Sequence, residues 1–484
     1  MGDGTGEPDT VRAVDAPDRA DRDPDRPDRS VVRPPRAPVP DRRPAPERGS
    51  DAPARSSVPR LVPVPGPDAR TGRSPAAFRA NGKTTVARVP AVQRAEPSRL
   101  TRFSDLSIGE IAERAGLKRI DVIAWRDYDD AEAGGSELHA HRVLAAWSQA
   151  GLDVSITTSS VPDGRTVIRR DGYRAIRRAG RYSVFPRTVL SGALGRVGNG
   201  DGLVEIWNGM PFLSPVWAHC PHIVFLHHVH AEMWKMVLPT GLAELGYAIE
   251  HRLAPPFYRR SRIVTLSSSA KREIVERLRI PPERVSVSPP GVEPQFSPAG
   301  DRCPDPLVVA VGRLVPVKRF HLMIEALVTL KARHPRLRAV IAGEGYERPA
   351  LEALVQRAGS ESWIALPGYI PEEKLIDLYR RAWVLASTSL REGWGMTVTE
   401  AGACGTPSVV TKIGGHEDAV LDGRTGILAD TQDDLVAGLD AVIRDEVLRR
   451  RLGTGAMAHA ARFTWEACAR GALVALAADA LARQ

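Results

Sequence analysis

The first 60 residues of this 484-residue chain contain no leucine, isoleucine, phenylalanine, tryptophan or tyrosine. They carry 12 arginines against 10 aspartates and 2 glutamates, so their charges cancel. A segment without large apolar side chains cannot bury enough surface to offset the loss of chain entropy on folding. We therefore expect residues 1–100 to form a disordered tail rich in Pro, Arg and Asp. The tail also lacks the apolar core of a secretion signal, which predicts a cytoplasmic protein.

Cysteine is scarce, and the four cysteines (Cys220, Cys303, Cys404 and Cys468) form no Cys-x-x-Cys pair. Their wide spacing disfavours a zinc site or a disulfide framework and fits a reducing compartment. Long apolar runs are also missing, since none approaches the roughly 18 residues that a membrane span requires. Any membrane contact is therefore expected to be peripheral.

Basic charge is concentrated in one segment. Residues 61–120 hold 11 Lys or Arg against 5 acids, which accounts for most of the formal net charge of +9. A basic segment of this kind suits an anionic membrane or nucleic acid. A solvated linker also explains this concentration of basic residues and is the interpretation that we favour. No nucleic-acid partner is therefore expected.

From Asp121 onward, short apolar runs alternate with longer segments of helical period, which is typical of parallel sheets with crossover helices. The expected strands are 121–125, 153–158, 204–207, 222–226, 262–266, 284–288, 306–312, 338–342, 363–366, 383–387 and 407–410. Residues 422–426, Asp-Gly-Arg-Thr-Gly, suggest a hairpin. A segment dense in Pro and Gly near 289–306 separates the two series of strands and predicts a hinge.

This pattern predicts an α/β protein with two doubly wound, Rossmann-like domains facing each other across a cleft. The expected parts are a lead-in helix in 101–118, an amino-terminal domain in 119–295 and a carboxy-terminal domain in 296–464. Residues 465–484 are rich in alanine and predict a closing helix that packs back on the amino-terminal domain. Ligands of such folds bind at the carboxyl ends of the strands.

Two carboxylates, Glu392 and Glu400, flank a turn rich in glycine that follows the strand predicted at 383–387. Gly395 permits a tight turn, and a helix is expected from about Met396, with Thr397 in its first turn. The free N–H groups of a helix start suit a phosphate, and each carboxylate accepts hydrogen bonds from a pair of hydroxyls. A nucleotide-sugar fits this layout. A surface carboxylate beside an ordinary acidic helix start explains it equally well.

Two cations, Arg313 and Lys318, follow the first strand of the second series and are suited to a diphosphate. Gly134 and Gly135 open a helix in the first series and form a second phosphate cradle. Weaker candidates are Gly343, in a Gly-x-Gly turn, and Tyr369 with Ile370, at a strand end where main-chain groups would hold a base.

Three histidines, His227, His228 and His230, follow the strand predicted at 222–226. A neutral imidazole there would contact a sugar hydroxyl or stabilise charge in the transition state. Alternation along a strand sends neighbours to opposite faces, and no nearby Asp or Cys completes a metal site, so no metal is expected. Eight arginines crowd residues 165–187, and this region is either an anionic-membrane or acceptor surface or an ordinary solvated face.

Together, these residues resemble the retaining nucleotide-sugar glycosyltransferases of family 4, which have the GT-B fold. The resemblance covers about residues 119–480 and is carried by the Glu-x7-Glu motif from Glu392 to Glu400, the Gly312-Arg313 and Lys318 pair, Gly134-Gly135 and Phe463-Thr464-Trp465. Trp394 and Met396 depart from the commoner residues of the motif.

The resemblance implies a role for each candidate residue. It implies that Arg313, Lys318, Gly135 and the 395–397 segment bind the donor diphosphate, and that Glu400 binds ribose hydroxyls. Gly343, Tyr369 and Ile370 would complete the nucleoside site. It also implies that Glu392 and His227 act at the donor sugar, with His228 as the alternative register.

The activity that the resemblance implies is transfer of a sugar, with retention and without a metal or other cofactor, from an NDP-sugar to a hydroxyl of a glycolipid, polysaccharide or small metabolite. The departing phosphate oxygen would take the acceptor proton. Two alternatives are a GT-B nucleotide-sugar epimerase and a nucleotide-binding scaffold without turnover. The base, sugar, acceptor and linkage are left open.

Overall fold

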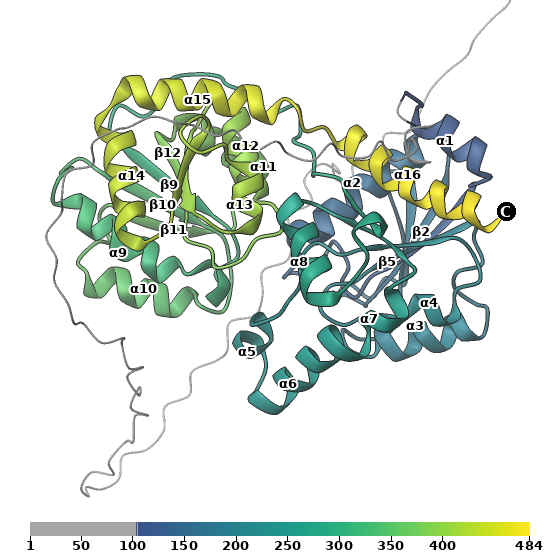
Figure 1. Ribbon diagram of the computed structural model, residues 1–484. Coiled ribbons are helices and arrows are strands. Elements are labelled where there is room, and N and C mark those ends of the chain that lie inside the picture. Colours follow the sequence, from purple (N-terminus) through teal and green to yellow (C-terminus); the bar gives the residue numbers. More distant parts are fainter. Residues whose placement is uncertain (1–102, 104) are drawn as a thin grey trace, which may run out of the picture. The chain divides into compact units, whose positions relative to one another are not determined.

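The computed structural model describes residue 103 and residues 105–484 (Figure 1). The predicted disordered tail, residues 1–100, lies outside the described residues, as does the start of the predicted lead-in segment. Within the described part, α1 (Ile108–Ala115) is a short helix with a capping box, in which Ser107 and Glu110 bind each other's backbone N–H groups. Its left-handed carboxyl cap is Gly116.

The first sheet has eight strands in the order β3-β4-β2-β1-β5-β6-β7-β8, and every pair is parallel except β3 with β4. The strands are β1 (Arg119–Ile123), β2 (Asp153–Thr158), β3 (Val167–Arg170), β4 (Tyr173–Arg177), β5 (Gly202–Ile206), β6 (His222–Phe225), β7 (Arg262–Thr265) and β8 (Val285–Val287). Every residue of β5 and β6 is buried. Burial on both faces explains why these strands are mostly apolar, with Glu205 and His222 as the polar exceptions.

Helices and short helical turns connect these strands (Figure 1). They are α2 (Gly135–Gln149), α3 (Val184–Ala193), α4 (Ser214–Trp217), α5 (Met233–Val237), α6 (Thr240–Ala248), η2 (Ile249–Leu253), α7 (Pro255–Tyr258), α8 (Ser268–Leu278) and η3 (Pro282–Arg284). The segment η2 is a turn of π-helix between α6 and α7.

The second sheet has six strands, all parallel, in the order β11-β10-β9-β12-β13-β14. They are β9 (Leu307–Val311), β10 (Arg338–Ala342), β11 (Ile364–Gly368), β12 (Val384–Ser387), β13 (Ser408–Thr411) and β14 (Gly426–Ala429). The helices are η4 (Pro316–Lys318), α9 (Phe320–Lys331), α10 (Arg348–Arg357), α11 (Glu372–Arg381), α12 (Met396–Ala403), α13 (Gly414–Ala419), α14 (Gln432–Arg444) and α15 (Glu446–Ala460).

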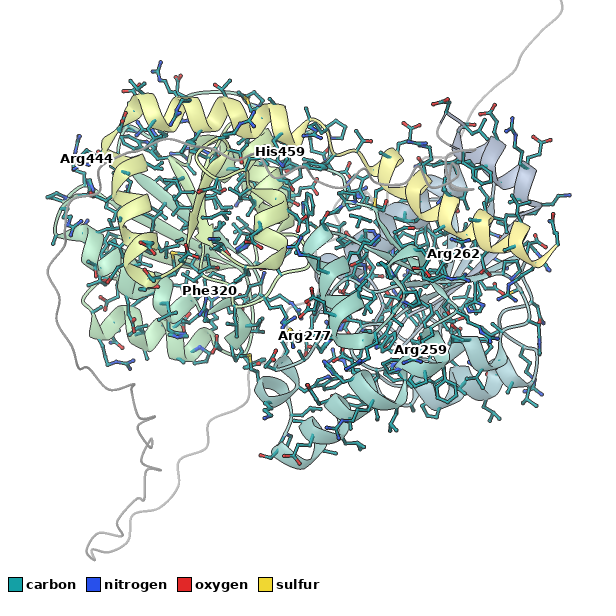
Figure 2. All side chains as sticks on the ribbon, in the orientation of Figure 1. Arg259, Arg262, Arg277, Phe320, Arg444 and His459 are labelled. Carbon is teal, nitrogen blue, oxygen red and sulfur yellow. The ribbon has the colours of Figure 1, made fainter. Side chains whose placement is uncertain are left out.

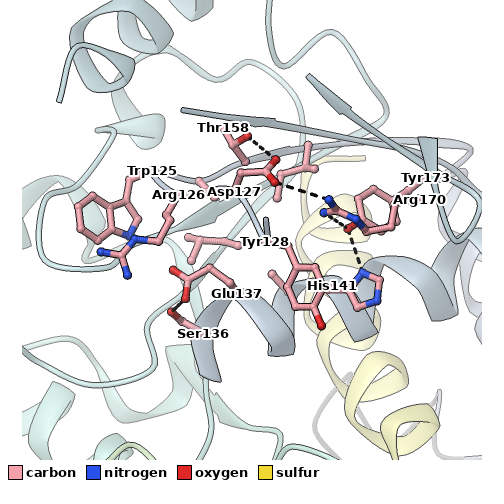
Figure 3. A pocket seen from close by; sticks show the side chains of 14 residues that line it. Trp125, Arg126, Asp127, Tyr128, Ser136, Glu137, His141, Thr158, Arg170 and Tyr173 are labelled. Carbon is pink, nitrogen blue, oxygen red and sulfur yellow. Dashed lines mark hydrogen bonds and ion pairs between the residues drawn. The ribbon is translucent and has the colours of Figure 1, made fainter. Parts of the chain in front are cut away.

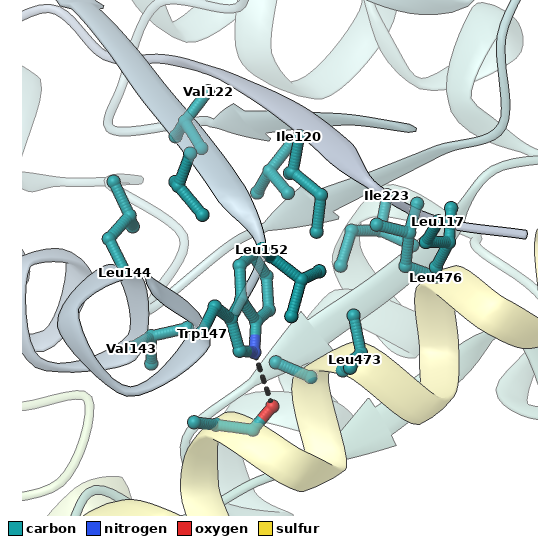
Figure 4. Packing of buried hydrophobic residues seen from close by; sticks show 14 of the residues in the cluster. Leu117, Ile120, Val122, Val143, Leu144, Trp147, Leu152, Ile223, Leu473 and Leu476 are labelled. Atoms are coloured by element: carbon teal, nitrogen blue, oxygen red, sulfur yellow. Dashed lines mark hydrogen bonds between the residues drawn. The ribbon is translucent and has the colours of Figure 1, made fainter. Parts of the chain in front are cut away.

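The last helix, α16 (Trp465–Arg483), packs on the first sheet and not on the second (Figure 1). Its alanine-rich face enters the same apolar core as α1 and α2, and the indole Nε1 of Trp147 donates to the Ala469 carbonyl at 2.9 Å (Figure 4). Small alanine side chains let α16 lie close to α2, so the two sequence ends of the described chain share one core.

Two features differ from the expectation. The strands β3 and β4 fall inside the arginine-rich segment, where alternating Arg hides the strand pattern. The hairpin predicted at residues 422–426 is wrong, because this segment is a turn that leads from α13 into β14, and β14 pairs in parallel with β13. Among the described residues, no helix is both long and apolar enough to cross a bilayer.

Candidate functional site

The strand order reverses at one point in each sheet. In the first sheet, β1 lies between β2 and β5, and in the second, β9 lies between β10 and β12. At such a point, the segments that follow two neighbouring strands turn to opposite faces of the sheet. A crevice then forms at the carboxyl ends of these strands. The loop after β9 carries Arg313 and Lys318, and the loop after β12 carries Glu392. The sequence candidates therefore lie at the switch point of the second sheet.

Backbone hydrogen bonds fasten the loops after β9 and β12 to each other. The Leu390 N–H donates to the Val317 carbonyl at 2.7 Å, and the Thr388 hydroxyl donates to the Lys318 carbonyl at 2.9 Å. The guanidinium of Arg319 donates in return to the Thr388 carbonyl at 2.7 Å. These contacts hold the Lys318 side chain beside Glu392.

Glu392 is an ionised carboxylate with two fixed partners. The Lys318 ammonium donates to its Oε1, and the Ser389 hydroxyl donates to the same oxygen at 2.7 Å. Burial by itself would raise the pKa of Glu392, but the charges of Lys318 and His416 and the two hydrogen bonds lower it to about 2. Both contacts are to Oε1, and within residues 105–484 the other oxygen, Oε2, accepts no hydrogen bond from a side chain.

The helix α12 begins directly after this loop. Gly395 is its amino cap and has φ 104°, a left-handed conformation that favours glycine, and an added Cβ would come within 3.1 Å of the His416 ring. The indole of Trp394 is buried under the turn. Met396 and Thr397 form the first turn, where the backbone N–H groups have no acceptor within the helix.

Glu400 lies in the second turn of α12. Its Oε2 accepts from the Tyr379 hydroxyl of α11 at 3.3 Å. Burial raises the pKa of Glu400 to about 7, with Glu372 and Glu293 acting in the same direction and the Tyr379 hydrogen bond opposing them. The pKa values of the two carboxylates of the motif therefore shift in opposite directions, because Lys318 touches Glu392 whereas no cation in the described part of the chain offsets the burial of Glu400.

Arg313 reaches toward the loop that opens α2. Its Nη1 lies 3.4 Å from the Glu132 carbonyl, and its Nε lies 3.3 Å from where a Cβ on Gly134 would stand. Met396 is equally close to Gly135, with its sulfur 3.4 Å from the corresponding position. The starts of α2 and α12 thus lie side by side with Arg313 between their loops. Larger residues at 134 and 135 would separate them.

The histidine loop after β6 meets the Glu392 loop. Arg391 donates to the Val229 carbonyl at 3.1 Å, and an added Cβ on Gly393 would come within 2.7 Å of the His227 carbonyl. The Nε2 of His227 lies 3.1 Å from the Nδ1 of buried His139. Its Nδ1 has no hydrogen-bond partner in the part of the chain that the structure describes.

The two adjacent histidines differ in what acts on them. Burial lowers the pKa of both rings to about 3. His227 packs against His139 and Phe225, whereas the charges of Arg391, Glu392 and Arg313 act on His228. His228 stacks on His230 at 4.9 Å. Both rings are neutral, and His228 is the one that the charges of the Glu392 loop reach.

The remaining nucleoside candidates lie at the ends of β10 and β11. A Cβ on Gly343 would stand 1.9 Å from the Gly312 carbonyl, so the packing of two loops is sufficient to require this glycine. Tyr369 is 78% exposed and Ile370 is partly buried. Within the described part of the chain, neither Tyr369 nor Ile370 forms a hydrogen bond or ion pair with Glu400 or Arg313.

A small pocket lies beside the start of α2 (Figure 3). Asp127 is buried at its base and binds the Thr158 hydroxyl at 3.1 Å and the Arg177 guanidinium at 3.0 Å. Tyr128 stacks on His141, with ring centroids 4.5 Å apart. Arg126 donates to the Glu132 carbonyl at 2.6 Å, the same oxygen that Arg313 approaches.

The arginine-rich region borders this pocket, and much of its charge is neutralised. Arg177 binds Asp127, Asp129 and Asp163, while Arg181 binds Asp130 and Glu132. Further pairs join Arg170 to Asp129 and Arg174 to Asp153. These pairs make the strand β4 and its surroundings a self-neutralised structural network. They disfavour the anionic-membrane interpretation of this segment.

Comparison with known proteins identifies the family. Residues 133–296 match the family model described as Glycosyltransferase Family 4, and residues 295–459 match Glycosyl transferases group 1. The D-inositol 3-phosphate glycosyltransferase of Acidothermus cellulolyticus is 31% identical over 332 residues, which cover 64% of this chain and 70% of that protein. The chain belongs to the family 4 glycosyltransferases. This confirms the predicted resemblance.

Other curated relatives with the same name match over about half of their own length. Among solved structures, a sucrose-phosphate synthase from Thermosynechococcus elongatus has a TM-score of 0.63 at 20% identity, covering 73% of this chain and 96% of that one. Anabaena HepE, solved with UDP and glucose, has a TM-score of 0.60 at 17% identity and covers 76% of this chain and 100% of that one. These similarities confirm the predicted two-domain GT-B fold.

Sequence reasoning missed several residues that shape the site of this family 4 chain. Ser389 and His416 act on Glu392, and Glu132 supplies the carbonyl that Arg313 approaches. Glu250 is fully buried and accepts the N–H groups of His230 at 2.8 Å and Ala231 at 3.1 Å, which fixes the histidine loop. No local pattern marks Glu250, because Glu244 lies in the same helical run and His251 and Arg252 follow directly.

Across residue 103 and residues 105–484, no group of three or more His, Cys, Asp or Glu side chains is arranged to hold a metal ion. The three histidines after β6 instead divide between a buried contact with His139 and a stack of two rings.

Proposed function

We propose that this protein transfers a sugar from a nucleotide diphosphate sugar to a hydroxyl group of an acceptor, with retention of anomeric configuration and without a metal. The observation that carries the proposal is the convergence of Lys318 with Glu392, and of Arg313 with the starts of α2 and α12. Cationic side chains and helix N–H groups would lie where the leaving diphosphate gains negative charge. Carboxylates nearby would accept hydrogen bonds from the hydroxyls of the donor sugar and the ribose.

Neutralisation of the leaving diphosphate would come from the protein itself. Arg313 offers a planar fork to phosphate oxygens and Lys318 a compact charge, while the Met396 and Thr397 amides add hydrogen bonds. Groups fixed before the reaction stabilise developing charge without reorganising, so they lower the barrier to C–O cleavage. We infer that these groups replace the metal that other phosphate-transferring sites employ.

The two carboxylates would hold the two hydroxyl-rich ends of the donor. Glu392 keeps its charge because Lys318 touches it, and its free Oε2 would accept a hydroxyl of the donor sugar. Glu400, in the second turn of α12, would accept hydrogen bonds from the ribose hydroxyls. Gly343, Tyr369 and Ile370 would contact the nucleobase. A retaining reaction of this type needs no carboxylate nucleophile, because the departing phosphate oxygen would take the acceptor proton.

A neutral histidine would contact the donor sugar near the anomeric centre. His227 is the predicted residue, and the charges of Glu392 and Arg313 that reach His228 favour the alternative register. In either register, a low pKa keeps the imidazole neutral at pH 7, so it would donate or accept a hydrogen bond without adding charge.

UDP-sugars are the donors that we propose to test first, because a solved protein of the same fold, Anabaena HepE, was crystallised with UDP and glucose. D-inositol 3-phosphate is the first acceptor to test, because it is in the name of the curated relatives. We propose a cytoplasmic enzyme that makes peripheral contact with an anionic membrane.

The test combines ligand binding with turnover. Ligands that bind only the folded protein raise its melting temperature, so UDP, GDP, ADP and their glucose conjugates are compared by thermal shift. Glu392→Gln keeps the shape of the side chain and is expected to retain the shift by the nucleotide while losing transfer by about 10- to 100-fold, the worth of a hydrogen bond to a charged group. Glu361→Gln, an exposed site, is the control.

Three outcomes would contradict the proposal. Unchanged turnover in Glu392→Gln would contradict the assignment of Glu392 to the donor site. If no nucleotide raises the melting temperature of the unmodified protein, the proposal of a nucleotide-sugar donor is contradicted. Release of an epimerised nucleotide-sugar, with no product bearing a new glycosidic bond, would favour the epimerase alternative, and binding without any turnover would favour the scaffold.

A further inference from the structure

Exposed apolar side chains gather on one group of helices in the first domain. Half of the large hydrophobic residues that are exposed in the described part of the chain lie in the segment 184–258. They are Leu190, Leu194, Val216, Met236, Leu242, Leu245, Tyr247, Leu253 and Phe257. Scattered exposed leucines are ordinary, but a cluster on adjacent helices indicates an interaction surface.

Helical spacing places four of these residues on one stripe. The elements α6, η2 and α7 follow one another along residues 240–258 with Ala254 as the only residue between them. Leu242, Leu245, Leu253 and Phe257 recur at intervals that keep them on one side of such a helical run, and each is more than half exposed. Ala243, Gly246 and Glu250 lie on an adjacent side of the same run and are buried.

A second stripe lies on α3. Leu190 and the following Leu194 are four residues apart and are 61% and 56% exposed, and Arg187 stands three residues before the first of them. The short helix α4 contacts both α3 and α7, so the two stripes belong to one row of helices (Figure 1). We call this row, α3-α4-α7-η2-α6, the apolar-arginine face.

The arginines of this face differ from those of β3 and β4. Arg187, Arg196, Arg252, Arg259 and Arg260 are exposed, and none has an ion pair within the described residues. Figure 2 labels Arg259, which follows α7. The one exposed acid in the 240–260 run is Glu244, on α6. Unpaired guanidinium groups beside exposed leucines therefore leave both positive charge and apolar surface available to a partner.

We propose that the apolar-arginine face rests on the surface of an anionic lipid bilayer. Leucine and phenylalanine side chains would enter the boundary between headgroups and acyl chains, and the arginines would pair with lipid phosphates. This locates the membrane contact proposed above on residues 184–260, and not on the paired arginines of 165–181. The inference does not depend on sugar transfer.

A second copy of the chain is a poorer occupant. In a two-fold symmetric contact, the same patch meets itself, so the unpaired arginines of one copy would face those of the other. Such like charges oppose association, whereas an anionic surface attracts them. Charge complementarity therefore favours lipid.

The test measures co-sedimentation of the full chain with vesicles of equimolar phosphatidylglycerol and phosphatidylcholine. The variant Arg252→Gln/Arg259→Gln/Arg260→Gln removes three unpaired arginines and is expected to lower the vesicle partition coefficient by about a hundred-fold, since each basic residue near the surface contributes about five-fold. Its control is Arg357→Gln/Arg424→Gln/Arg451→Gln, which removes three exposed arginines of the other domain and should leave partitioning unchanged.

A second variant tests the apolar part. Leu242→Ser/Leu245→Ser/Leu253→Ser/Phe257→Ser is expected to lower partitioning at least about ten-fold while its melting temperature and its transfer to an acceptor in solution are unchanged. Val328→Ser/Val447→Ser, on exposed positions of the second domain, is the control. High salt should weaken binding of the unmodified chain, because surface charges are screened.

Several results would overturn the inference. Equal partitioning of the arginine variant and its control would place any lipid contact elsewhere, including the basic segment 61–120 that all variants share. Equal binding to vesicles of phosphatidylcholine alone would remove the role of charge. Loss of a dimer in sedimentation velocity, with vesicle binding unchanged, would assign the face to a second copy.

Discussion

Removal of the Lys318 charge should destabilise the carboxy-terminal domain by leaving Glu392 half-buried and unpaired. The pKa of Glu392 is lowered from its ordinary 4.5 to about 2. One pKa unit corresponds to about 1.4 kcal/mol, so the partners of this carboxylate stabilise the folded state by about 3 kcal/mol at pH 7, most of it from Lys318. Lys318→Met should therefore lower the melting temperature by about 6 to 12 °C.

The double variant Lys318→Met/Glu392→Gln separates charge from packing. It removes the unpaired carboxylate, so most of the melting temperature lost in Lys318→Met should return. Transfer activity should not return, because both donor contacts are missing. Thermal unfolding and sugar transfer are measured on the same preparations, with Lys412→Met, which removes an exposed ion pair with Asp430, as the control.

The pH dependence gives an independent check with a defined sign. A carboxylate with a lowered pKa stabilises the fold above its unfolded pKa, and that contribution fades as the pH falls toward the folded value. The difference between the unmodified protein and Lys318→Met should be constant from pH 6 to 8 and shrink below about pH 4.5. Equal melting temperatures of Lys318→Met and the double variant, or a difference that grows in acid, would refute this account of the pair.

Three further variants test other parts of the site. Because the pKa of Glu400 is raised to about 7, the affinity for nucleotide should increase as the pH rises through 7, and calorimetry should show a flat profile for Glu400→Gln. Gly343→Ala would place a Cβ 1.9 Å from the Gly312 carbonyl, so its melting temperature should fall and its KM for the donor should rise, whereas Gly241→Ala, with open space, should do neither. Glu205→Ala removes a buried carboxylate that accepts two backbone N–H groups and a tyrosine hydroxyl, and should lower stability by at least about 2 kcal/mol in a urea titration without a change in kcat.

Local sequence patterns were sufficient for the fold and for the positions of the motifs. Runs such as residues 307–311 and 223–225 are apolar throughout because both faces of each strand are covered, so this burial can be recognised in the sequence. Gly134 and Gly395 mark helix starts because the backbone there needs small residues. Strands β3 and β4 were not predicted because several of their positions carry arginine, and the turn at residues 422–426 was wrongly predicted to be a hairpin.

The sequence alone determined which chemical groups stand at strand ends, and only the tertiary structure decided which of them meet. Lys318 and Glu392 are 74 residues apart in the sequence. They form a pair because hydrogen bonds join their two loops at the switch point of the second sheet. Arg177 and Asp127, 50 residues apart, neutralise each other, whereas Arg259 has no such partner among the described residues. Periodicity records how much of each element is buried, but the partner of a charge depends on distances between elements that no local pattern contains.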